Sequence, residues 1–392
     1  MTEWQTKSVG EIADTQLGKM LNKGKQSGKF AKPYLRTDNV HWGHFDLSEI
    51  KEMDIFPDEQ EKYLATKGDL LMCEGGASGR TAIWNEDYNI SFQNHVHRIR
   101  PKDPREIAPK YLLYYFEWFI KNGFASDLIK GVTISSLSQS GLRSIAVTYP
   151  LIQEQYKIVE ILEDHLSRLD SALVDVKQAK IKSSQFRRSL LQAAFSGNLN
   201  SNGTFLKPDI PGEWREERFG DIFKVKYGKA IDKSLRLDFA EFPVVGSAGI
   251  MTYTKTPLTS EPTIVIGRKG NVGSIQIFKE GCYPIDTTYY MPTISDFDID
   301  FLTYQLTSLE LVKLDSSTAT PSLRREDLEN VRVVIPPMGE QLEIVAQIEN
   351  HLSLLDAAVD TADAMEKQSN GLRRSLLQAA FTGQLTKGVV SV

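Results

Sequence analysis

Cysteine is scarce in this chain: Cys73 and Cys282 are the two among 392 residues, and they lie far apart. Two distant cysteines do not make the disulfide framework of a small secreted domain, so a reducing compartment is expected. Long hydrophobic runs are also missing, and none approaches the roughly 18 residues that a membrane-spanning helix needs. The opening Met1-Thr-Glu-Trp has neither the basic nor the apolar segment of a signal peptide. We therefore expect a cytoplasmic protein with no membrane segment.

The motifs of several enzyme classes are absent as well. No Asn-Pro-Pro-aromatic sequence of an adenine methyltransferase occurs, and no Glu-x-Lys follows Pro57-Asp58 at the distance of a nuclease site. The loop from Glu74 to Thr81 imitates a phosphate-binding P-loop, but Glu74 replaces its first glycine and Arg80 its lysine. No spacing typical of a zinc site is found among His41, His44, His95, His97 and Cys73. We predict no catalytic residue, no metal site and no cofactor bound by this chain.

An excess of positive charge is lacking too. The chain has 46 Lys and Arg against 51 Asp and Glu, a formal net charge of −5. This balance disfavours a protein that coats nucleic acid indiscriminately, while leaving room for local basic faces. The length suffices for two or three domains, each with its own core.

The dominant feature that is present is a long helix written twice. The nine residues Arg187 to Phe195 return unchanged as Arg373 to Phe381, an offset of 186 residues. The same offset carries Glu154-Gln155 onto Glu340-Gln341, and a proline precedes each copy. An internal duplication of this kind decides the architecture.

Each copy has a seven-residue rhythm. Steps of four and three alternate in the first copy through Ile158, Leu162, His165, Leu169, Ala172, Val176, Ala179, Ser183, Phe186, Leu190 and Ala193. The second copy repeats this seam at the same offset, so both segments are predicted to form a coiled coil. Packing of one copy against the other, antiparallel and crossing near Ala172 and Ala358, would cover both seams. His165 and His351 then act as polar residues that set the register. The alternative is that the two segments are core helices of unrelated compact domains.

Two globular stretches flank these helices and resemble each other loosely. Residues 1–149 begin with Trp4 and Val9-Gly10-Glu11-Ile12, which match Trp214 and Phe219-Gly220-Asp221-Ile222. Gly18-Lys19 matches Gly228-Lys229, Gly79 matches Gly273, and Ser136-Leu137 matches Ser322-Leu323. Framework positions repeat while loop residues differ, as expected for one scaffold that reads two different targets.

The predicted organisation has five parts. A first domain spans residues 1–149 and a central repeat helix 150–199. A linker with a second domain spans 200–335, a distal repeat helix 336–386 and a tail 387–392. Short strands, an aromatic helix over Ile107 to Phe119 whose aromatics belong to the core, and a strand over Leu142 to Val147 are expected in the first domain. The fold class is therefore α+β, with two pseudo-symmetric α/β domains separated and joined by two long antiparallel coiled-coil helices.

This arrangement resembles the specificity subunit of type I restriction-modification systems over essentially the whole chain. The residues that carry the resemblance are Pro150 to Gln155 with Phe186 to Gly197, and Pro336 to Gln341 with its matching tail. The second copy departs by beginning Pro336-Pro337 and by carrying Asn370-Gly371 within the helix, where glycine costs about 1 kcal/mol relative to alanine.

The resemblance implies a mechanism and a set of partners. Each domain would be a target-recognition domain that reads one half of a split, asymmetric sequence in double-stranded DNA, with the spacer set by the coiled coil. The helices would dock two methylation subunits, and a restriction and translocation subunit would join the assembly. Those partners, and not this chain, would bind S-adenosylmethionine, ATP and magnesium.

The candidate DNA contacts come from the basic and glycine-containing loops. Basic side chains near glycines approach a phosphate backbone with few obstacles. Those chosen for phosphates are Lys19, Lys25, Lys29, Arg36, Lys229, Lys233 and Arg236. Those chosen for base edges or nearby backbone are Ser78, Arg80, Asn94, Thr133, Ser135, Arg268, Lys269, Asn271, Thr320 and Arg324. The simpler interpretation of the first basic loop is a solvated surface.

Two other functions remain open from the sequence. The first is a duplicated coiled-coil scaffold that binds proteins without DNA specificity, which the acidic net charge favours slightly. The second is a self-contained modification enzyme, against which the missing methyltransferase motif argues. Salt-dependent, sequence-selective DNA binding separates the scaffold from a DNA reader.

Overall fold

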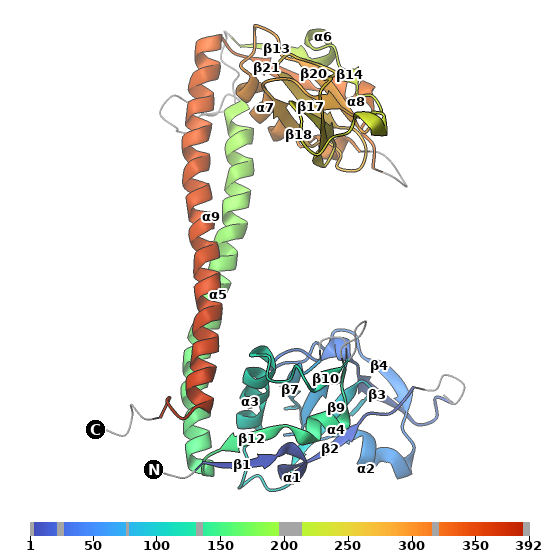
Figure 1. Ribbon diagram of the computed structural model, residues 1–392, viewed down its shortest axis with the longest axis vertical. Coiled ribbons are helices and arrows are strands. Elements are labelled where there is room, and N and C mark those ends of the chain that lie inside the picture. The colour runs from blue at the N-terminus through green and yellow to red at the C-terminus, as the bar shows by residue number, and fades with distance from the viewer. Residues whose placement is uncertain are drawn as a thin grey trace. The chain divides into compact units, whose positions relative to one another are not determined.

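The computed structural model describes residues 4–21, 27–75, 78–130, 136–195, 214–315 and 321–386. The chain divides into two compact units, one formed by Met1–Asp175 with Met365–Val392 and the other by Val176–Ala364. Each unit therefore holds one globular domain together with part of both long helices (Figure 1). None of the helices in the described part of the chain has the length and apolar composition of a membrane span. The predicted linker and the tail lie outside the described residues.

Two four-stranded sheets form the first domain. The first sheet is antiparallel and has the strand order β2(Ala13–Leu17), β9(Val96–Pro101), β6(Leu70–Cys73), β7(Thr81–Ile83). The second sheet, in which β3 and β8 are parallel, has the order β4(Lys51–Asp54), β3(Ala31–Leu35), β8(Ile90–Phe92), β5(Leu64–Ala65). Smaller elements are β1(Gln5–Ser8) paired with β12(Ala146–Tyr149), β10(Ile129–Lys130) paired with β11(Ser136–Leu137), α1(Val9–Ile12), η2(Thr37–Asn39), η3(Pro57–Glu59), α2(Gln60–Tyr63) and α4(Gln139–Ser144).

The second domain repeats this topology in the same strand order. Its first sheet is β14(Lys226–Tyr227), β20(Thr288–Pro292), β17(Thr263–Gly267), β18(Ile275–Phe278). Its second sheet is β16(Gly249–Thr254), β15(Phe242–Gly246), β19(Tyr283–Pro284), in which β15 and β19 are parallel as β3 and β8 are, and within the described residues it has no counterpart of β5. Smaller elements are β13(Arg215–Arg218) paired with β21(Arg332–Ile335), α6(Phe219–Ile222), η4(Lys233–Leu235), η5(Leu311–Leu314) and α8(Arg325–Glu329). The loose repeat read from the sequence is thus a repeat of fold.

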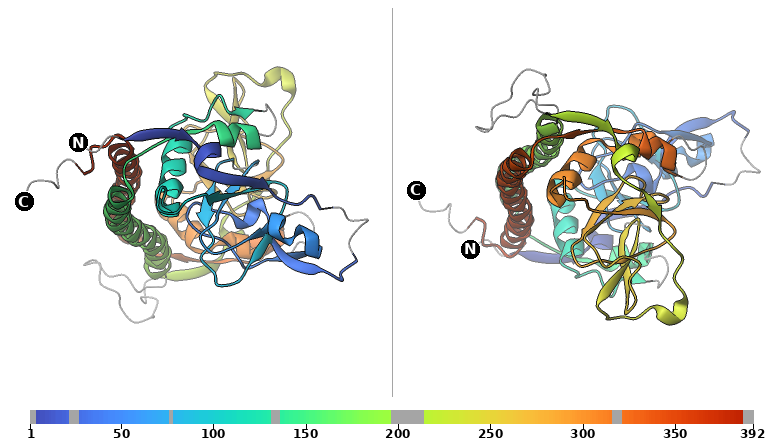
Figure 2. Two further views of the ribbon diagram at one scale, coloured as in Figure 1. Left: turned by 90° about the horizontal axis from the view of Figure 1, so that it is seen from below. Right: turned by 90° about the horizontal axis from the view of Figure 1, so that it is seen from above.

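One helix in each domain forms a layer between a sheet and the long helices. This helix is α3(Pro109–Lys121) in the first domain and α7(Ile299–Ser308) in the second (Figure 2). Pro109 stands in the first turn of α3, where a missing N–H does no harm. Tyr111, Tyr115 and Phe116 are buried in the core of their unit. The prediction that the aromatics of this helix belong to the core is therefore confirmed.

The two long helices are α5(Ile152–Phe195) and α9(Met338–Phe381), and they pack antiparallel within each unit. In the second unit, Lys180 forms an ion pair with Asp363, and Arg187 with Asp356. Residue numbers therefore rise along one helix as they fall along the other. In the first unit, Arg373 pairs with Asp170 at 3.0 Å. Arg373 is the repeat equivalent of Arg187, and Asp170 is that of Asp356, so the same ion pair occurs once in each unit.

Half of the predicted seam is one residue out of place. Leu162, Leu169 and Val176 turn inward as predicted, but His165, Ala172 and Ala179 are exposed. The side chains that turn inward instead are those that follow them, namely Leu166, Leu173 and Lys180. A search for apolar residues passes over lysine. The apolar stem of a lysine side chain can nevertheless pack in a helix interface while its ammonium stays in water. The register-setting role of His165 was wrong, and His351 places its Nδ1 2.8 Å from the Gln347 carbonyl of its own helix.

The predicted crossing point was also wrong. Because Asp356 lies opposite Arg187, Ala358 lies opposite residues near 185 and not opposite Ala172. The prediction aligned the midpoints of two equal helices. In the structure, the first turns of each helix pack instead on the globular domain that precedes it, as Ile158 does in the first unit. This requirement staggers the two helices.

The repeated nine-residue segment at the end of each long helix packs on a globular domain in both units. At the end of α9, Leu377, Ala380 and Phe381 join the core of the first unit. At the end of α5, Leu190 and Phe195 are among the residues that join the core of the second unit. The domain met by α5 at its end is thus the one that follows it in sequence. The identity of the two segments reflects two equivalent packing sites.

Two further sequence expectations are settled by the local backbone. The predicted strand from Leu142 to Val147 was wrong in its first half, because α4 continues to Ser144 and β12 begins at Ala146. Ser138 caps α4 by accepting the N–H of Gly141, a signal that favours a helix at this place. Helix α9 runs unbroken through Asn370-Gly371.

Candidate nucleic-acid interface

Two loops meet at the end of the first sheet in the second domain. The turn between β17 and β18 carries Arg268, Lys269 and Asn271, and a bridge joins Lys269 to Ser322. The N–H of Leu323 also donates to the Arg268 carbonyl at 2.9 Å. The candidate readers Arg268, Lys269 and Asn271 are therefore brought next to Arg324, although 53 residues separate Asn271 from Arg324 in sequence.

The first domain joins the equivalent two loops in the same way. A bridge joins Gly75 to Ser136, and the N–H of Leu137 donates to the Glu74 carbonyl at 2.8 Å. Ser78 and Arg80 belong to this turn, between β6 and β7. The other two candidates of this pair of loops, Thr133 and Ser135, lie outside the described residues, as does Thr320 in the second domain. We name this pair of joined loops the two-loop platform.

The backbone conformation of the platform favours glycine at one equivalent position in each domain. Gly79 and Gly273 adopt φ angles of 90° and 75°, a region that favours glycine. Gly79 donates its N–H to the Cys73 carbonyl at 2.9 Å, and Gly273 to that of Gly267 at 2.8 Å. The predicted equivalence of the two glycines is therefore confirmed in structure.

A second glycine pair positions the lysines that follow it. A Cβ on Gly18 would lie 2.2 Å from the Gln93 carbonyl oxygen, and one on Gly228 would lie 2.1 Å from that of Ile285. Both positions thus require glycine, because the backbone passes directly against a neighbouring strand. Asn94 donates its N–H to the Lys19 carbonyl at 3.0 Å, so these two candidates lie together.

Most of the described basic candidates of the first domain are engaged inside it. The ammonium of Lys19 donates to the Asp54 carbonyl at 2.8 Å and forms an ion pair with Glu59. Arg36 lies 3.6 Å from Asp38 and 3.5 Å from Glu49, and Arg80 donates to the Thr37 carbonyl at 2.9 Å. Lys29 is exposed, and Lys25 lies outside the described residues. These contacts stabilise the loops that the candidates belong to.

The basic candidates of the second domain have a different environment. Those with exposed side chains are Lys229, Lys233, Arg236, Lys269 and Arg324, and Asn271 is exposed beside them. Within this set, the Arg236 guanidinium donates to the Ile231 carbonyl at 3.2 Å. The basic candidates of the second domain are therefore more accessible than the described candidates of the first.

Arg268 is held between aromatic rings, and this group was missed in the sequence. Its guanidinium lies 5.5 Å from the ring centre of Tyr227 and 6.0 Å from that of Tyr289, and it donates to the Asp286 carbonyl at 2.9 Å. Arg325 covers Tyr227 at 6.0 Å, and that ring is 48% exposed. Burial, followed by the Tyr227 hydroxyl, raises the pKa of Tyr289 to about 12, so Tyr289 stays neutral. An exposed tyrosine just before Gly228-Lys229 was the available signal, and Tyr227 joins the candidate contacts.

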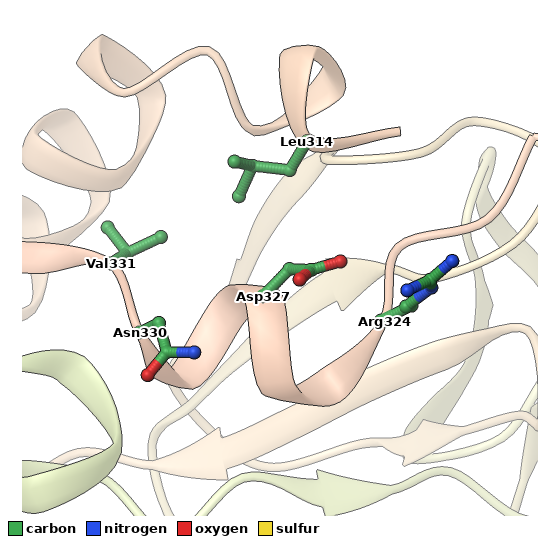
Figure 3. Close-up of a pocket in the computed structure, with 5 residues that line it drawn as sticks. All are labelled: Leu314, Arg324, Asp327, Asn330 and Val331. Atoms are coloured by element: carbon green, nitrogen blue, oxygen red, sulfur yellow. The ribbon is translucent and has the colours of Figure 1, made fainter. Parts of the chain in front are cut away.

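A cleft beside Arg324 does not serve as a nucleic-acid site. It has a volume of about 520 Å³ and is lined by Leu314, Arg324, Asp327, Asn330 and Val331 (Figure 3). Asp327 and Leu314 face this space together. The Asp327 carboxylate at this place repels phosphate, so the cleft itself is unfavourable for a DNA backbone, although Arg324 lines both the cleft and the platform.

The histidines and cysteines considered for a metal have other surroundings. His97 is buried with Nε2 2.9 Å from the Leu137 carbonyl, and burial lowers its pKa. The Cys73 thiol lies 3.7 Å from the Thr37 carbonyl, and the rings of His41 and His44 stack at 5.1 Å. Across the described ranges, no group of three or more possible ligands has the geometry of a metal site.

Comparison with known proteins identifies the family of this chain. The family described as the type I restriction modification DNA specificity domain matches residues 1–182 and 211–358. The chain belongs to this family of type I restriction-modification specificity subunits. DNA recognition is therefore its role, and a protein-interaction scaffold without DNA specificity is not favoured.

Individual relatives agree over the whole length. The chain is 21% identical to the putative type I restriction enzyme MjaX specificity subunit of Methanocaldococcus jannaschii, covering 98% of this chain and 94% of that protein. It is 24% identical to the type I restriction enzyme EcoDI specificity subunit of Escherichia coli, covering 98% and 89%. A chain from a structural study of type I restriction-modification assembly superposes with a TM-score of 0.80 at 18% identity, covering 98% of this specificity subunit and 100% of that chain. The HsdS subunit of Thermoanaerobacter tengcongensis superposes with a TM-score of 0.58 at 18% identity, covering 97% of each. The two-domain fold with long helices is thus shared.

The unequal exposure of basic side chains leads to a prediction about salt. We expect Lys229→Gln and Lys233→Gln each to reduce the slope of log Kd against log salt by about 1 for duplex DNA of mixed sequence. A variant that makes one phosphate contact fewer releases fewer counterions when it binds. The full-length subunit would be titrated at several salt concentrations. Lys279→Gln is the matched control, since this exposed lysine of the same domain lies 3.5 Å from Asp300 on α7. Unchanged slopes for Lys229→Gln and Lys233→Gln would remove both from the DNA interface.

Proposed function

We propose that this specificity subunit reads a split, asymmetric DNA target, with one half of the sequence assigned to each globular domain. The observation that carries the proposal is the two-loop platform, which recurs on the same framework in both domains with different side chains. A shared framework orients both readers alike, whereas different loop side chains meet different base edges. The candidate residues named above are the proposed contacts.

The long helices are proposed to set the spacer and to dock two methylation subunits. Each unit exposes apolar side chains at the same two repeat positions: Tyr156 and Leu372 in the first unit, and Leu342 and Phe186 in the second. Exposed apolar groups at equivalent places support two equivalent docking sites. We further propose that a restriction subunit completes a cytoplasmic assembly. In that assembly, this chain is non-catalytic and the partners bind S-adenosylmethionine, ATP and magnesium.

The test is a map of methylated adenines in host DNA with and without the gene. The expected result is that methylation disappears at one split, asymmetric motif when the gene is removed. Exchanging residues 1–149 for those of another family member should then change one half of that motif and leave the other half intact. If the exchange altered both halves, the assignment of one half to each domain would be rejected.

A further inference from the structure

Two buried glutamines, one at each domain–helix junction, make the same set of hydrogen bonds. Gln155 and Gln341 are separated by one repeat, and each is 0% exposed. Each stands in the first turn of its long helix, Gln155 in α5 and Gln341 in α9. Buried polar side chains are rare unless they are fully hydrogen-bonded.

In the first unit, the Gln155 carboxamide joins three segments of chain. Its Oε1 accepts the N–H of Ala108, the residue that precedes α3, at 2.9 Å. Its Nε2 donates to the Glu106 carbonyl at 2.8 Å and to the Pro150 carbonyl at 2.9 Å. Both donors are used, and together with the accepted bond they connect the start of α5 to the start of α3.

The second unit repeats the arrangement. Gln341 Oε1 accepts the N–H of Asp298, which precedes α7, at 2.9 Å. Its Nε2 donates to the Asp296 carbonyl at 2.8 Å and to the Pro336 carbonyl at 3.0 Å. We call Gln155 and Gln341, with these bonds, the glutamine clamps.

The clamps differ in kind from the apolar packing around them. Apolar contacts are non-directional, so packing alone lets a domain rotate slightly at little cost. Other polar contacts also join a domain to the long helices, such as Arg373 to Glu117 at 2.9 Å in the first unit, but the three bonds of each clamp recur at both junctions. Three hydrogen bonds from one planar carboxamide depend on distance and on angle, and they resist such rotation. Since the two-loop platform belongs to the domain, its orientation relative to the helix start follows from the clamp.

We infer that Gln155 and Gln341 are positioning residues that determine how strictly the protein selects the spacer length of its DNA target. This inference rests on the proposed function. One added base pair moves a half-site by about 3.4 Å along the duplex and turns it by about 35°. A long helix distinguishes such a step only if the domain cannot rotate at the junction to follow the displaced half-site.

The test compares DNA targets that differ only in spacer length. Gln155→Met keeps the size of the side chain and removes all three hydrogen bonds, and Gln341→Met does the same at the other junction. Gln178→Met is the matched control, because Gln178 is an exposed glutamine of the same helix. Kd would be measured for the subunit assembled with its methylation partners, on duplexes carrying the native motif with its spacer unchanged, one base pair shorter or one longer.

We expect each clamp variant to reduce the preference for the native spacer by about tenfold, which corresponds to about 1.4 kcal/mol. The preference for the bases of each half-site should stay unchanged, and the control should behave like the wild type. In host DNA, methylation should appear at motifs with the altered spacer.

Other outcomes separate the inference from a purely structural role. Equal weakening for all three spacers would overturn it and make the clamps ordinary folding contacts. If Gln155→Met does not fold, Gln341→Met tests the same set of bonds at the other junction, and it should broaden spacer choice by itself. A wild-type protein indifferent to spacer length would reject the proposed function, and the inference with it.

Discussion

Arg373→Ala is expected to destabilise the first unit by about 3 kcal/mol, because it leaves a buried carboxylate without its main partner. Arg187→Ala, the same residue one repeat earlier, is expected to cost only about 0–1 kcal/mol. The eight residues that follow each arginine are identical, so the difference chiefly measures the tertiary environment.

The expected difference comes from Glu117 on α3. The Arg373 Nε lies 2.9 Å from Glu117, whose side chain is 4% exposed, whereas Arg187 pairs with an Asp356 side chain that is 60% exposed. Burial alone raises the pKa of Glu117, but the hydrogen bond and charge of Arg373, followed by Lys121, outweigh burial and hold that pKa below its ordinary value of 4.5. Lys121 also lies 2.6 Å from Glu117, and we expect this pair to persist in the variant, which keeps the loss at the lower end for a buried pair.

Hydrogen exchange of the full-length subunit measures both variants, since it resolves peptides from each unit. Faster exchange should be confined to peptides of the first unit in Arg373→Ala. The pair also predicts a pH effect. A carboxylate with a lowered pKa in the folded state stabilises the unit above pH 4.5, and this contribution is lost as the pH falls below that value. Similar exchange in both arginine variants would contradict the buried-pair argument.

Phe381→Ala is expected to destabilise the first unit by about 4 kcal/mol, within the range for a buried phenylalanine. Phe381 is 5% exposed, and its ring centre lies 5.3 Å from Tyr111, 5.2 Å from Tyr115 and 5.4 Å from Trp118. The substitution removes one ring from an aromatic cluster that joins the end of α9 to α3, and a close-packed interior fills such a gap only partly.

Tryptophan fluorescence during chemical denaturation reports this loss. Four of the five tryptophans, Trp4, Trp42, Trp84 and Trp118, belong to the first unit, so the signal follows that unit. Leu372→Ala is the matched control, since this apolar residue of α9 belongs to the same unit, is 47% exposed, and its loss should change stability by less than about 0.5 kcal/mol. Equal shifts of the midpoint for both variants would show that the end of α9 is not part of the core.

Much of the fold could be predicted because it depends on neighbouring residues or on a segment that is repeated 186 residues later. The structure confirms the 186-residue repeat, the aromatic helix that begins at Pro109, and the equivalence of Gly79 and Gly273 in the two domains. The seam of the coil was half right, because an apolar pattern selects Ala179 over Lys180 and cannot see the aspartate that meets the lysine. The same limit applies to the candidate site. The sequence indicated the loops that carry it, but it did not indicate that the Tyr227 ring lies against Arg268, because 41 residues separate the two.

The sequence by itself determined the duplication, the heptad period and the equivalence of the repeated glycines, because each is a property of neighbouring residues or of a copied segment. Tertiary structure alone decided three other things. It bonded the Lys19 ammonium to Glu59, it placed Phe195 and Phe381 in the cores of different units, and it buried one of two identical arginines beside a carboxylate. Each of these depends on groups far apart in the chain, and their electrostatic and packing energies exist only once folding has brought them into contact.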